Sequence, residues 1–388
     1  MVTTHRLVIG DARDLSPIAD GSVQLIVTSP PYPMIGMWDP TFAALSPQSV
    51  ALLQAGEGMA AFEEMHRVLD SVWVECARVL QPGGFACINI GDATRTVAGR
   101  FALYPNHARI SVALQRLGLT PLPDILWRKP TNAPTKFMGS GMLPAGAYVT
   151  YEHEYVLVFR KGGKRRFTAA EKRIRARSAF FWEERNLWFS DLWSDLVGAR
   201  QGLGERTARD RSGAFPLELP YRLIQMYSMQ GDTVLDPFVG TGTTMAAALA
   251  SGRSSLGVER DPELAAGVLR SLADSVAEGR QRASRRLRDH LAFVADREAA
   301  GKAFRHTSRP YGFPVMTRQE VDLELFVPAQ IEHTTAGVVA DHAPAAAPAP
   351  DAPAHDTPRD PANDDARPSR REPERRNQTL PLPGLFEP

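Results

Sequence analysis

The sequence predicts an α/β fold with a doubly wound sheet, because two strand-like segments each end in a motif typical of a ligand-binding turn. Residues 22–27 lead into Thr28-Ser29-Pro30-Pro31-Tyr32, and residues 232–235 lead into Asp236-Pro237-Phe238-Val239-Gly240-Thr241-Gly242-Thr243-Thr244. Both segments are rich in β-branched and aliphatic residues, as strands inside a sheet are. Open α/β sheets bind ligands at the carboxyl ends of their strands, so the two turns are expected to form one pocket.

The later turn has the composition of a nucleoside-binding loop. Gly240 and Gly242 let the backbone approach a ligand closely, and an Ala-rich helical segment, residues 243–250, follows directly. The next strand-like segment ends in Glu259, whose carboxylate can accept both hydroxyls of a ribose. Asp236 is either a ligand contact or the N-cap of the helix, and the two roles are compatible.

The same loop departs from the nucleotide fingerprints in two ways. Met245 stands where a dinucleotide fingerprint has its third glycine, and the loop lacks the lysine of a phosphate-binding loop. NAD and ATP are therefore poorer fits than S-adenosylmethionine. The alternative interpretation of this segment is a tight turn without a ligand.

The earlier turn has features suited to chemistry on an amino group. Two successive prolines stiffen the loop and leave its carbonyl groups free to accept hydrogen bonds. The Ser29 hydroxyl and the Pro30 carbonyl could accept from an exocyclic amino group and draw its nitrogen toward tetrahedral geometry. Tyr32 offers an aromatic face on which an extruded base could stack. The alternative is a surface Pro-Pro turn with a half-buried tyrosine.

Together these motifs resemble the β class of amino-group DNA methyltransferases, in which the catalytic motif precedes the cofactor motif. The resemblance spans residues 5 to 265 and implies a Rossmann-like sheet with a circularly permuted motif order. It also implies base flipping in double-stranded DNA and S-adenosylmethionine as cofactor. Ser29 favours cytosine N4 as the target, because adenine-N6 enzymes mostly have aspartate at this position. Adenine N6 is the alternative, followed by RNA or protein-amide methylation and by an inactive DNA-binding partner.

The resemblance also assigns roles to single residues. Asp11 would lie near the cofactor adenine, and Phe215 would border the methionine moiety. The implied cofactor-binding set is Asp11, Phe215, Asp236, Pro237, Phe238, Gly240, Gly242, Thr243, Thr244 and Glu259, and the catalytic set is Ser29, Pro30, Pro31 and Tyr32. Residues 33–39 and 104–109 are similar to a narrower group of cytosine-N4 enzymes associated with the palindrome CTAG.

Composition excludes several other classes of protein. The chain has 388 residues and 43% hydrophobic content, with no long apolar segment and no signal-peptide pattern, so a cytoplasmic protein is expected. Its two cysteines, Cys76 and Cys87, are too few for a disulfide framework and lie outside any catalytic-looking loop, which disfavours methylation at cytosine C5. No metal site is expected, and the triplet Glu152-His153-Glu154 is interpreted as exposed or paired strand residues.

A strongly basic segment lies between residues 160 and 177, where β-class enzymes have their target-recognition region. Such a run is typical of contacts to DNA phosphates, and the alternative is a solvated face. The residues assigned to DNA binding are Lys164, Arg165, Arg166, Lys172 and Arg173.

The expected organisation divides the chain into five parts. Residues 1–160 form the catalytic half, 161–210 the recognition insert, and 211–300 the cofactor-binding half with a C-terminal helix that begins at Asp261. Residues 301–340 have an indecisive pattern, and residues 341–388 form a disordered Pro/Ala-rich tail. The segment 378–386 loosely resembles peptides that dock on bacterial replication clamps, which adds a clamp to DNA and a cognate restriction endonuclease as candidate partners.

Overall fold

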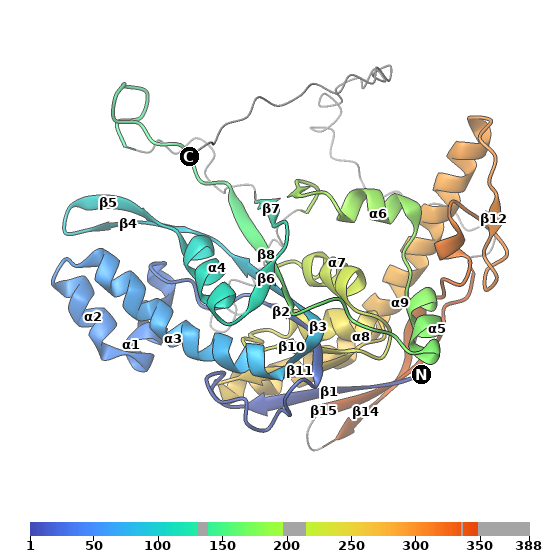
Figure 1. The fold of residues 1–388 in the computed structure, drawn as a ribbon, viewed down its shortest axis with the longest axis horizontal. Coiled ribbons are helices and arrows are strands. Elements are labelled where there is room, and N and C mark those ends of the chain that lie inside the picture. The colour runs from blue at the N-terminus through green and yellow to red at the C-terminus, as the bar shows by residue number, and fades with distance from the viewer. Residues whose placement is uncertain (130–138, 197–214, 335–336, 348–388) are drawn as a thin grey trace, which may run out of the picture. The chain divides into compact units, whose positions relative to one another are not determined.

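The computed structural model describes residues 1–129, 139–196, 215–334 and 337–347 and confirms the α/β class (Figure 1). Its central sheet has the strand order β14-β15-β1-β11-β10-β2-β3-β8-β7-β9, and β6 pairs with β8 off this path. The replication-clamp segment and nearly all of the predicted tail lie outside the described residues.

Five parallel strands form the middle of the sheet. They are β1 (Val2–Ile9), β11 (Ser254–Glu259), β10 (Thr233–Asp236), β2 (Val23–Thr28) and β3 (Leu80–Ile90). β10 pairs directly with β2, with Val234 opposite Leu25 and Leu235 opposite Ile26. The two predicted turns therefore leave adjacent strands at the same edge of the sheet, as expected from the motif order.

Further strands extend the sheet on both sides, and all of them pair antiparallel except β9, which runs parallel to β7. Beyond β3 lie β8 (His153–Lys161), β7 (Ile125–Arg128), β9 (Leu192–Trp193) and the short β6 (Leu119–Pro121). Beyond β1 lie β15 (Gly337–Pro344) and β14 (Phe326–Thr334). The expected tail begins at residue 341, whereas β15 pairs with β1 up to Asp341 and with β14 up to Pro344.

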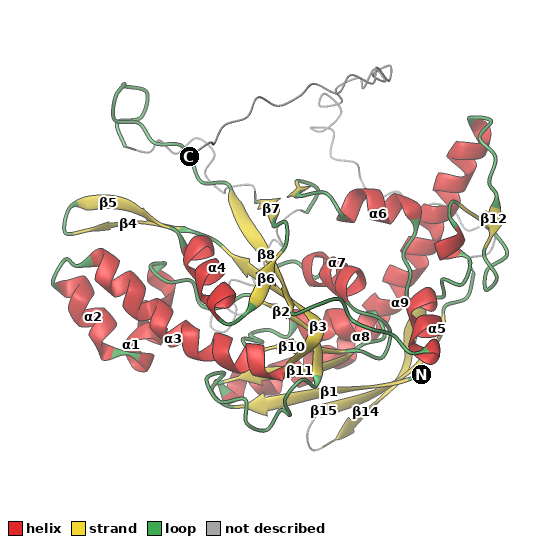
Figure 2. Cartoon of the chain, in the orientation of Figure 1, coloured by secondary structure: helices red, strands yellow, loops and turns green. Residues whose placement is uncertain are grey.

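Helices cover both faces of the sheet, which makes the fold doubly wound (Figure 2). Alternate strand residues point to opposite faces, so Ile26 and Ile88 pack with α3 (Gly58–Val79) and α4 (Asn106–Arg116). Leu25 and Val27 pack instead with α7 (Glu218–Tyr227) and α8 (Thr243–Ala250). Cys76 and Cys87 are buried free thiols. Cys76 lies in the core on the face covered by α3 and α4, and Cys87 in the core on the face covered by α7 and α8.

Short elements follow the carboxyl ends of β2 and β3. After β2 come the 3-10 turn η1 (Gly36–Trp38) and the helices α1 (Asp39–Leu45) and α2 (Pro47–Gln54). After β3 comes a hairpin of β4 (Ala93–Val97) and β5 (Arg100–Tyr104). These elements consequently surround the edge at which the pocket was expected.

The chain beyond β8 builds a satellite core. It includes α5 (Ala169–Arg177), α6 (Trp182–Trp188), β12 (His306–Thr307), β13 (Pro314–Val315) and the 3-10 turn η3 (Arg318–Glu320). Phe181 packs there with Leu287 of the long helix α9 (Pro262–Ala299) and with Phe313. The Asp261 side chain caps α9 by accepting from the Glu263 amide, as predicted. In the described ranges, the helices include none that is both long and apolar enough to cross a bilayer.

Candidate active site

A buried hydrogen bond joins the two predicted motifs. The Thr28 hydroxyl at the end of β2 donates to Asp236 Oδ1 at the end of β10, at 2.6 Å. The Phe238 amide donates to the same oxygen at 3.0 Å, so the carboxylate also shapes the turn that follows it. These bonds fix Ser29, the next residue after Thr28, beside the cofactor loop.

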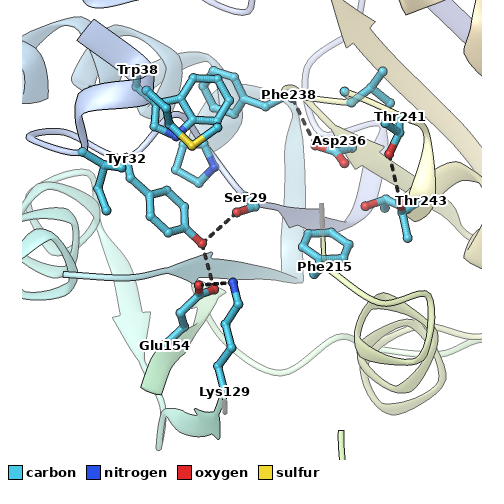
Figure 3. A pocket seen from close by; sticks show the side chains of 16 residues that line it. Ser29, Tyr32, Trp38, Lys129, Glu154, Phe215, Asp236, Phe238, Thr241 and Thr243 are labelled. Atoms are coloured by element: carbon cyan, nitrogen blue, oxygen red, sulfur yellow. Dashed lines mark hydrogen bonds and ion pairs between the residues drawn. The ribbon is translucent and has the colours of Figure 1, made fainter. Parts of the chain in front are cut away.

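Residues from both motifs line a cavity of about 220 Å³ (Figure 3). Ser29, Pro30 and Tyr32 form one wall. The predicted cofactor residues on the other wall are Phe215, Asp236, Phe238, Gly240, Thr243 and Thr244. The structure thus brings together most of the residues that the sequence assigned to catalysis and to the methionine part of the cofactor.

A second cavity of about 380 Å³ adjoins the first and has a volume typical of small-ligand pockets. Predicted residues in its lining are Asp11, Pro31, Pro237, Phe238, Gly240 and Glu259. Ser29, Trp38 and Phe238 border both cavities. Ser29 therefore lies where a group in one cavity could meet a group in the other.

Two carboxylates in the second cavity are held in place by nearby donors. Glu259 accepts from the Gly240 amide at 3.0 Å and from the Asp261 amide at 2.9 Å. Burial alone would raise the pKa of Asp11, but hydrogen bonds from Arg13 outweigh it and lower that pKa. Since an ionised carboxylate has about four acceptor positions, both groups retain capacity for ligand hydroxyl or amino groups.

Gly242 has a backbone role. It precedes α8 in the left-handed conformation with φ 84°, which favours glycine. A Cβ atom at this position would lie 2.7 Å from Cγ1 of Val268 in α9. Its small size thus lets the cofactor loop pack against α9.

Asp236 is almost completely buried in the first cavity, with 3% of its surface exposed. Burial raises its pKa to about 6, against the opposing effect of the hydrogen bond from Thr28. A cation in the cavity would favour the ionised form. The site therefore has a buried acceptor suited to a positively charged ligand.

Tyr32 is held by a hydrogen-bonded network that the sequence did not predict. Figure 3 shows its hydroxyl pointing toward Ser29 and Glu154. The Tyr32 oxygen lies 3.1 Å from Ser29 Oγ, 3.0 Å from Glu154 Oε2 and 2.9 Å from Asn89 Nδ2. Lys129 Nζ donates to Glu154 Oε1 at 2.8 Å. Burial and the nearby Glu154 carboxylate raise the pKa of Tyr32, so its hydroxyl stays protonated.

Glu154, Lys129 and Asn89 were missed as site residues. The interpretation of the Glu152-His153-Glu154 triplet as paired residues is correct for Glu154, but its partners line the pocket. Alternate residues of β8 share one face, and Val156 and Val158 of that face pack in one core cluster. Glu154 continues the same alternation toward the start of β8, and this alternation was the sequence signal that could have identified it.

The structure changes the interpretation of the basic segment. β8 runs antiparallel to β3, with Tyr155 opposite Ile90 and Arg160 opposite Phe85. β8 therefore starts at the pocket edge and ends at the opposite edge of the sheet. Residues that follow Lys161, including Lys164, Arg166, Lys172 and Arg173, leave the sheet at that opposite edge.

Arg165 is engaged within the chain. Its guanidinium forms ion pairs with Asp232 at 2.8 Å and Glu171 at 3.3 Å. Asp232 directly precedes β10, which again places Arg165 at the amino ends of the parallel strands. Arg165 is thus paired within the chain, while the assignment of the five basic residues to DNA binding stays a prediction.

Other exposed side chains lie on the β4–β5 hairpin, which follows β3, and at the carboxyl end of β7. Phe101 of the β4–β5 hairpin stacks on Tyr148 with 4.8 Å between ring centroids, and both rings are substantially exposed. Arg100 is exposed at the start of β5. Arg128 at the end of β7 is 64% exposed and forms a long ion pair with Glu152 at 3.5 Å. Among the described residues, His, Cys, Asp and Glu side chains form no group of three arranged to hold a metal ion.

Asn106 connects the two segments that resemble the narrower CTAG-associated group. Its Nδ2 donates to the carbonyl of Pro33 at 3.1 Å and to that of Gly91 at 2.9 Å. Met37 and Trp38, from the first of these segments, line the first cavity. The two segments are thus part of one structure around the substrate turn.

Comparisons with known proteins agree with this geometry. The model of the N6/N4 DNA methylase family matches residues 23–269. The type II methyltransferase M.MthZI of Methanothermobacter thermautotrophicus is 48% identical over 330 residues, which cover 84% of this chain and 92% of that protein. The type II methyltransferase M.MjaI of Methanocaldococcus jannaschii is 47% identical, with coverage of 68% and 89%.

A solved structure has the same fold. TTHA0409 of Thermus thermophilus, named a DNA modification methylase and complexed with S-adenosyl-L-methionine, aligns with a TM-score of 0.55 and 35% identity. The alignment covers 70% of this chain and 96% of that chain. These matches confirm the resemblance inferred from the sequence motifs: the chain belongs to the N6/N4 family of DNA methylases.

Proposed function

We propose that the protein transfers a methyl group from S-adenosylmethionine to the exocyclic N4 of cytosine in duplex DNA. The observation that carries this proposal is the position of Ser29, which borders both adjoining cavities. An amino group held by Ser29 in the first cavity would face a methyl group presented from the cofactor side. Such placement supplies much of the rate of a direct transfer, since no covalent enzyme intermediate is required.

The residues present fit the proposed cofactor. Glu259 and Asp11 would accept from the adenosine part in the second cavity, and Phe238 provides an apolar wall. Asp236 would accept from the cationic methionine part, beside Phe215 and the loop at Gly240. The cofactor would supply an electrophilic methyl group.

The substrate turn suits an extruded base. The Ser29 hydroxyl oxygen and the Pro30 carbonyl would accept the two amino hydrogens, and the Tyr32 ring would stack on the base. A neutral Ser29 at the first position of the tetrapeptide supports cytosine N4 over adenine N6. CTAG is proposed as the recognition site because residues 33–39 and 104–109 are similar to the CTAG-associated group.

The duplex is proposed to lie across the pocket edge of the sheet. Extrusion of a base requires contacts to the backbone on both sides of the target. Arg100 and Arg128 are exposed at this edge and can contact phosphates. A restriction endonuclease as cognate partner is proposed from the type II methyltransferases among the relatives, and a replication clamp is proposed as a second partner from the sequence of residues 378–386.

The test is methylation of matched duplexes in vitro by the full chain. One duplex contains CTAG and the control contains CATG, which has the same bases in another palindrome. Mass spectrometry of the digested nucleosides should find N4-methylcytosine only in the CTAG duplex. N6-methyladenine would refute the base assignment, equal methylation of both duplexes would refute the site, and methylation confined to the matching RNA would refute DNA as substrate.

The variant Ser29→Ala makes the same test specific to the pocket. It removes one acceptor for the amino group, so the methyl-transfer rate should fall on the order of a hundredfold. Cofactor affinity measured by calorimetry should stay near the wild-type value, because Ser29 serves the base. Wild-type turnover in Ser29→Ala would show that methyl transfer does not take place at this site.

A further inference from the structure

Glu154 is a pocket carboxylate that the proposed transfer does not yet use. It lies near the start of β8, and 13% of its side chain is exposed. It lines the same cavity as Ser29 and Tyr32 and reaches it from a different part of the sheet. A carboxylate in the lining of this cavity is close enough to the proposed substrate turn to affect the reaction.

The hydrogen-bond directions around Tyr32 follow from chemistry alone. An ionised carboxylate only accepts, so the Tyr32 hydroxyl must donate its single hydrogen to Glu154 Oε2. The phenol oxygen then only accepts, and it receives bonds from Asn89 Nδ2 and Ser29 Oγ. The pKa of Tyr32 is raised by burial, which keeps this hydrogen in place.

These bond directions determine the role of the Ser29 hydroxyl. Because its hydroxyl hydrogen is donated to Tyr32, the lone pairs of Ser29 Oγ are left for the cavity. A serine hydroxyl can otherwise donate or accept. The network thus makes Ser29 an acceptor, which is the role that an amino-group substrate requires.

Two further donors fix the orientation of the Glu154 carboxylate. Lys129 Nζ holds Glu154 Oε1 at 2.8 Å, and Asn89 Nδ2 holds Oε2 at 2.7 Å. A Cβ atom at Gly91 would lie 3.1 Å from the Tyr32 ring and 3.3 Å from Glu154 Cγ, so glycine allows the close packing.

We infer that Glu154 is a positioning residue that sets Ser29 as acceptor and receives the proton released from the target amine through Tyr32. This inference rests on the proposed function. As the N4 lone pair forms the bond to the methyl carbon, the carbon–sulfur bond breaks and leaves its electron pair on sulfur. The surplus N4 proton passes to Ser29 Oγ, the Ser29 proton to Tyr32, and the Tyr32 proton to Glu154, which ends neutral.

Two variants interrupt this hydrogen-bonded path from Ser29 to Glu154 at different points. In Glu154→Gln the amide oxygen is drawn to Lys129, so the amide nitrogen donates to Tyr32 and reverses the direction of every bond up to Ser29. In Tyr32→Phe the ring that stacks on the base remains, but the link between Ser29 and Glu154 is absent. Glu63→Gln is the matched control, because it removes the charge of an ion-paired glutamate away from the pocket.

The measurement is the single-turnover rate of methyl transfer, with enzyme in excess over DNA and with saturating cofactor. Glu154→Gln and Tyr32→Phe should each lower it by about 10- to 100-fold, and the double variant should be no slower than Tyr32→Phe. A solvent deuterium isotope effect on the wild-type rate should be lost in Tyr32→Phe. Cofactor and DNA affinities should stay within about twofold of wild type in all variants, and Glu63→Gln should match the wild type.

Wild-type rates in both pocket variants would overturn the inference, as would additive losses in the double variant. A loss explained by weakened DNA or cofactor binding would assign Glu154 a purely structural role and also overturn it. A wild-type chain that methylates no nucleic acid would instead refute the proposed function. A methylating wild type with an unaffected Glu154→Gln would overturn the inference and leave that function intact.

Discussion

Asp236 combines structural and ligand-binding demands in one carboxyl group. It accepts from Thr28 and from the Phe238 amide, and it faces the cavity where a cationic ligand is proposed. Its pKa is raised to about 6 by burial, so keeping it ionised at neutral pH costs folding free energy. Such a cost is acceptable where an ionised group binds a ligand.

The isosteric variant Asp236→Asn should be more stable than the wild type at neutral pH but bind the cofactor less well. Between the unfolded pKa of 3.8 and the folded pKa of about 6, the folded wild type holds more protons and loses stability as pH rises. The stability difference should grow from near zero at pH 4 to at most about 3 kcal/mol above pH 6. Denaturant unfolding at both pH values measures it.

Calorimetry provides the companion measurement. S-adenosylmethionine should bind Asp236→Asn at least about tenfold more weakly, because a charged hydrogen bond is replaced by a neutral one. A stability difference independent of pH would show that Asp236 is not the titrating group. Unchanged affinity of Asp236→Asn for S-adenosylmethionine would show that Asp236 does not bind the cofactor.

Residues in contiguous motifs could be predicted from the sequence, whereas Glu154, Lys129 and Asn89 of the network could not. Ser29, Tyr32 and Asp236 each follow a strand-like segment, so their place at its carboxyl end was readable. Glu154 reaches the same pocket on an antiparallel strand, and its neighbours in sequence carry no motif. Its role depends on a pairing between β3 and β8 that the residue pattern alone does not specify.

At the scale of elements, strand direction decides which surfaces share the pocket edge. The basic segment was assigned to DNA from its position in the chain, between the late strands and the cofactor strand. Because β8 is antiparallel, it ends with that segment at the far edge, whereas the β4–β5 hairpin follows the carboxyl end of β3. Charge composition predicts an affinity for phosphate but contains no information on strand direction.

Neutralising the pocket edge should therefore affect DNA binding more than neutralising the basic segment. Arg100→Gln with Arg128→Gln should weaken binding to all duplexes and reduce the slope of log affinity against log salt by about 0.9 per lost contact. The control replaces Lys164 and Arg166 with glutamine, which is the same change in charge. Fluorescence anisotropy at several salt concentrations compares the two variants.

The opposite ranking of the two variants would restore the basic segment as the DNA-binding surface. Cofactor affinity serves as the check on folding, since none of these four side chains lines either cavity among the described residues.

At the scale of the whole molecule, α9 links the sheet to the segments before and after it. Arg286 of α9 forms a buried ion pair with Glu184 of α6 at 2.5 Å, and His290 pairs with Glu183 at 2.8 Å. The His290 ring stacks on Phe181 and also bonds the Pro314 carbonyl at 2.9 Å. Within residues 301–340, the strands β12 and β13 have only two residues each and are too short to give a periodic pattern, and Val315 of β13 packs in this satellite core.

The pair of His290 and Glu183 should make global stability depend on pH. Burial works to lower the pKa of His290, but the bonds to Glu183 and to the Pro314 carbonyl outweigh it and raise that pKa. A raised pKa means that the folded state binds the proton more tightly than the unfolded state does. The stabilisation is fully present below the unfolded value of 6.5 and is lost as pH rises through the folded pKa.

Glu183→Gln should remove this dependence while it keeps the size of the side chain. The wild type should exceed Glu183→Gln in free energy of unfolding at pH 6, and the difference should shrink as pH rises from 6 to 9. Asp289 also lies near Glu183, and burial raises its pKa. Because both proteins contain Asp289, the difference between them cancels most of its contribution. A constant difference across the window would mean that His290 stays neutral in the fold, held only by packing between Phe181 and Phe313.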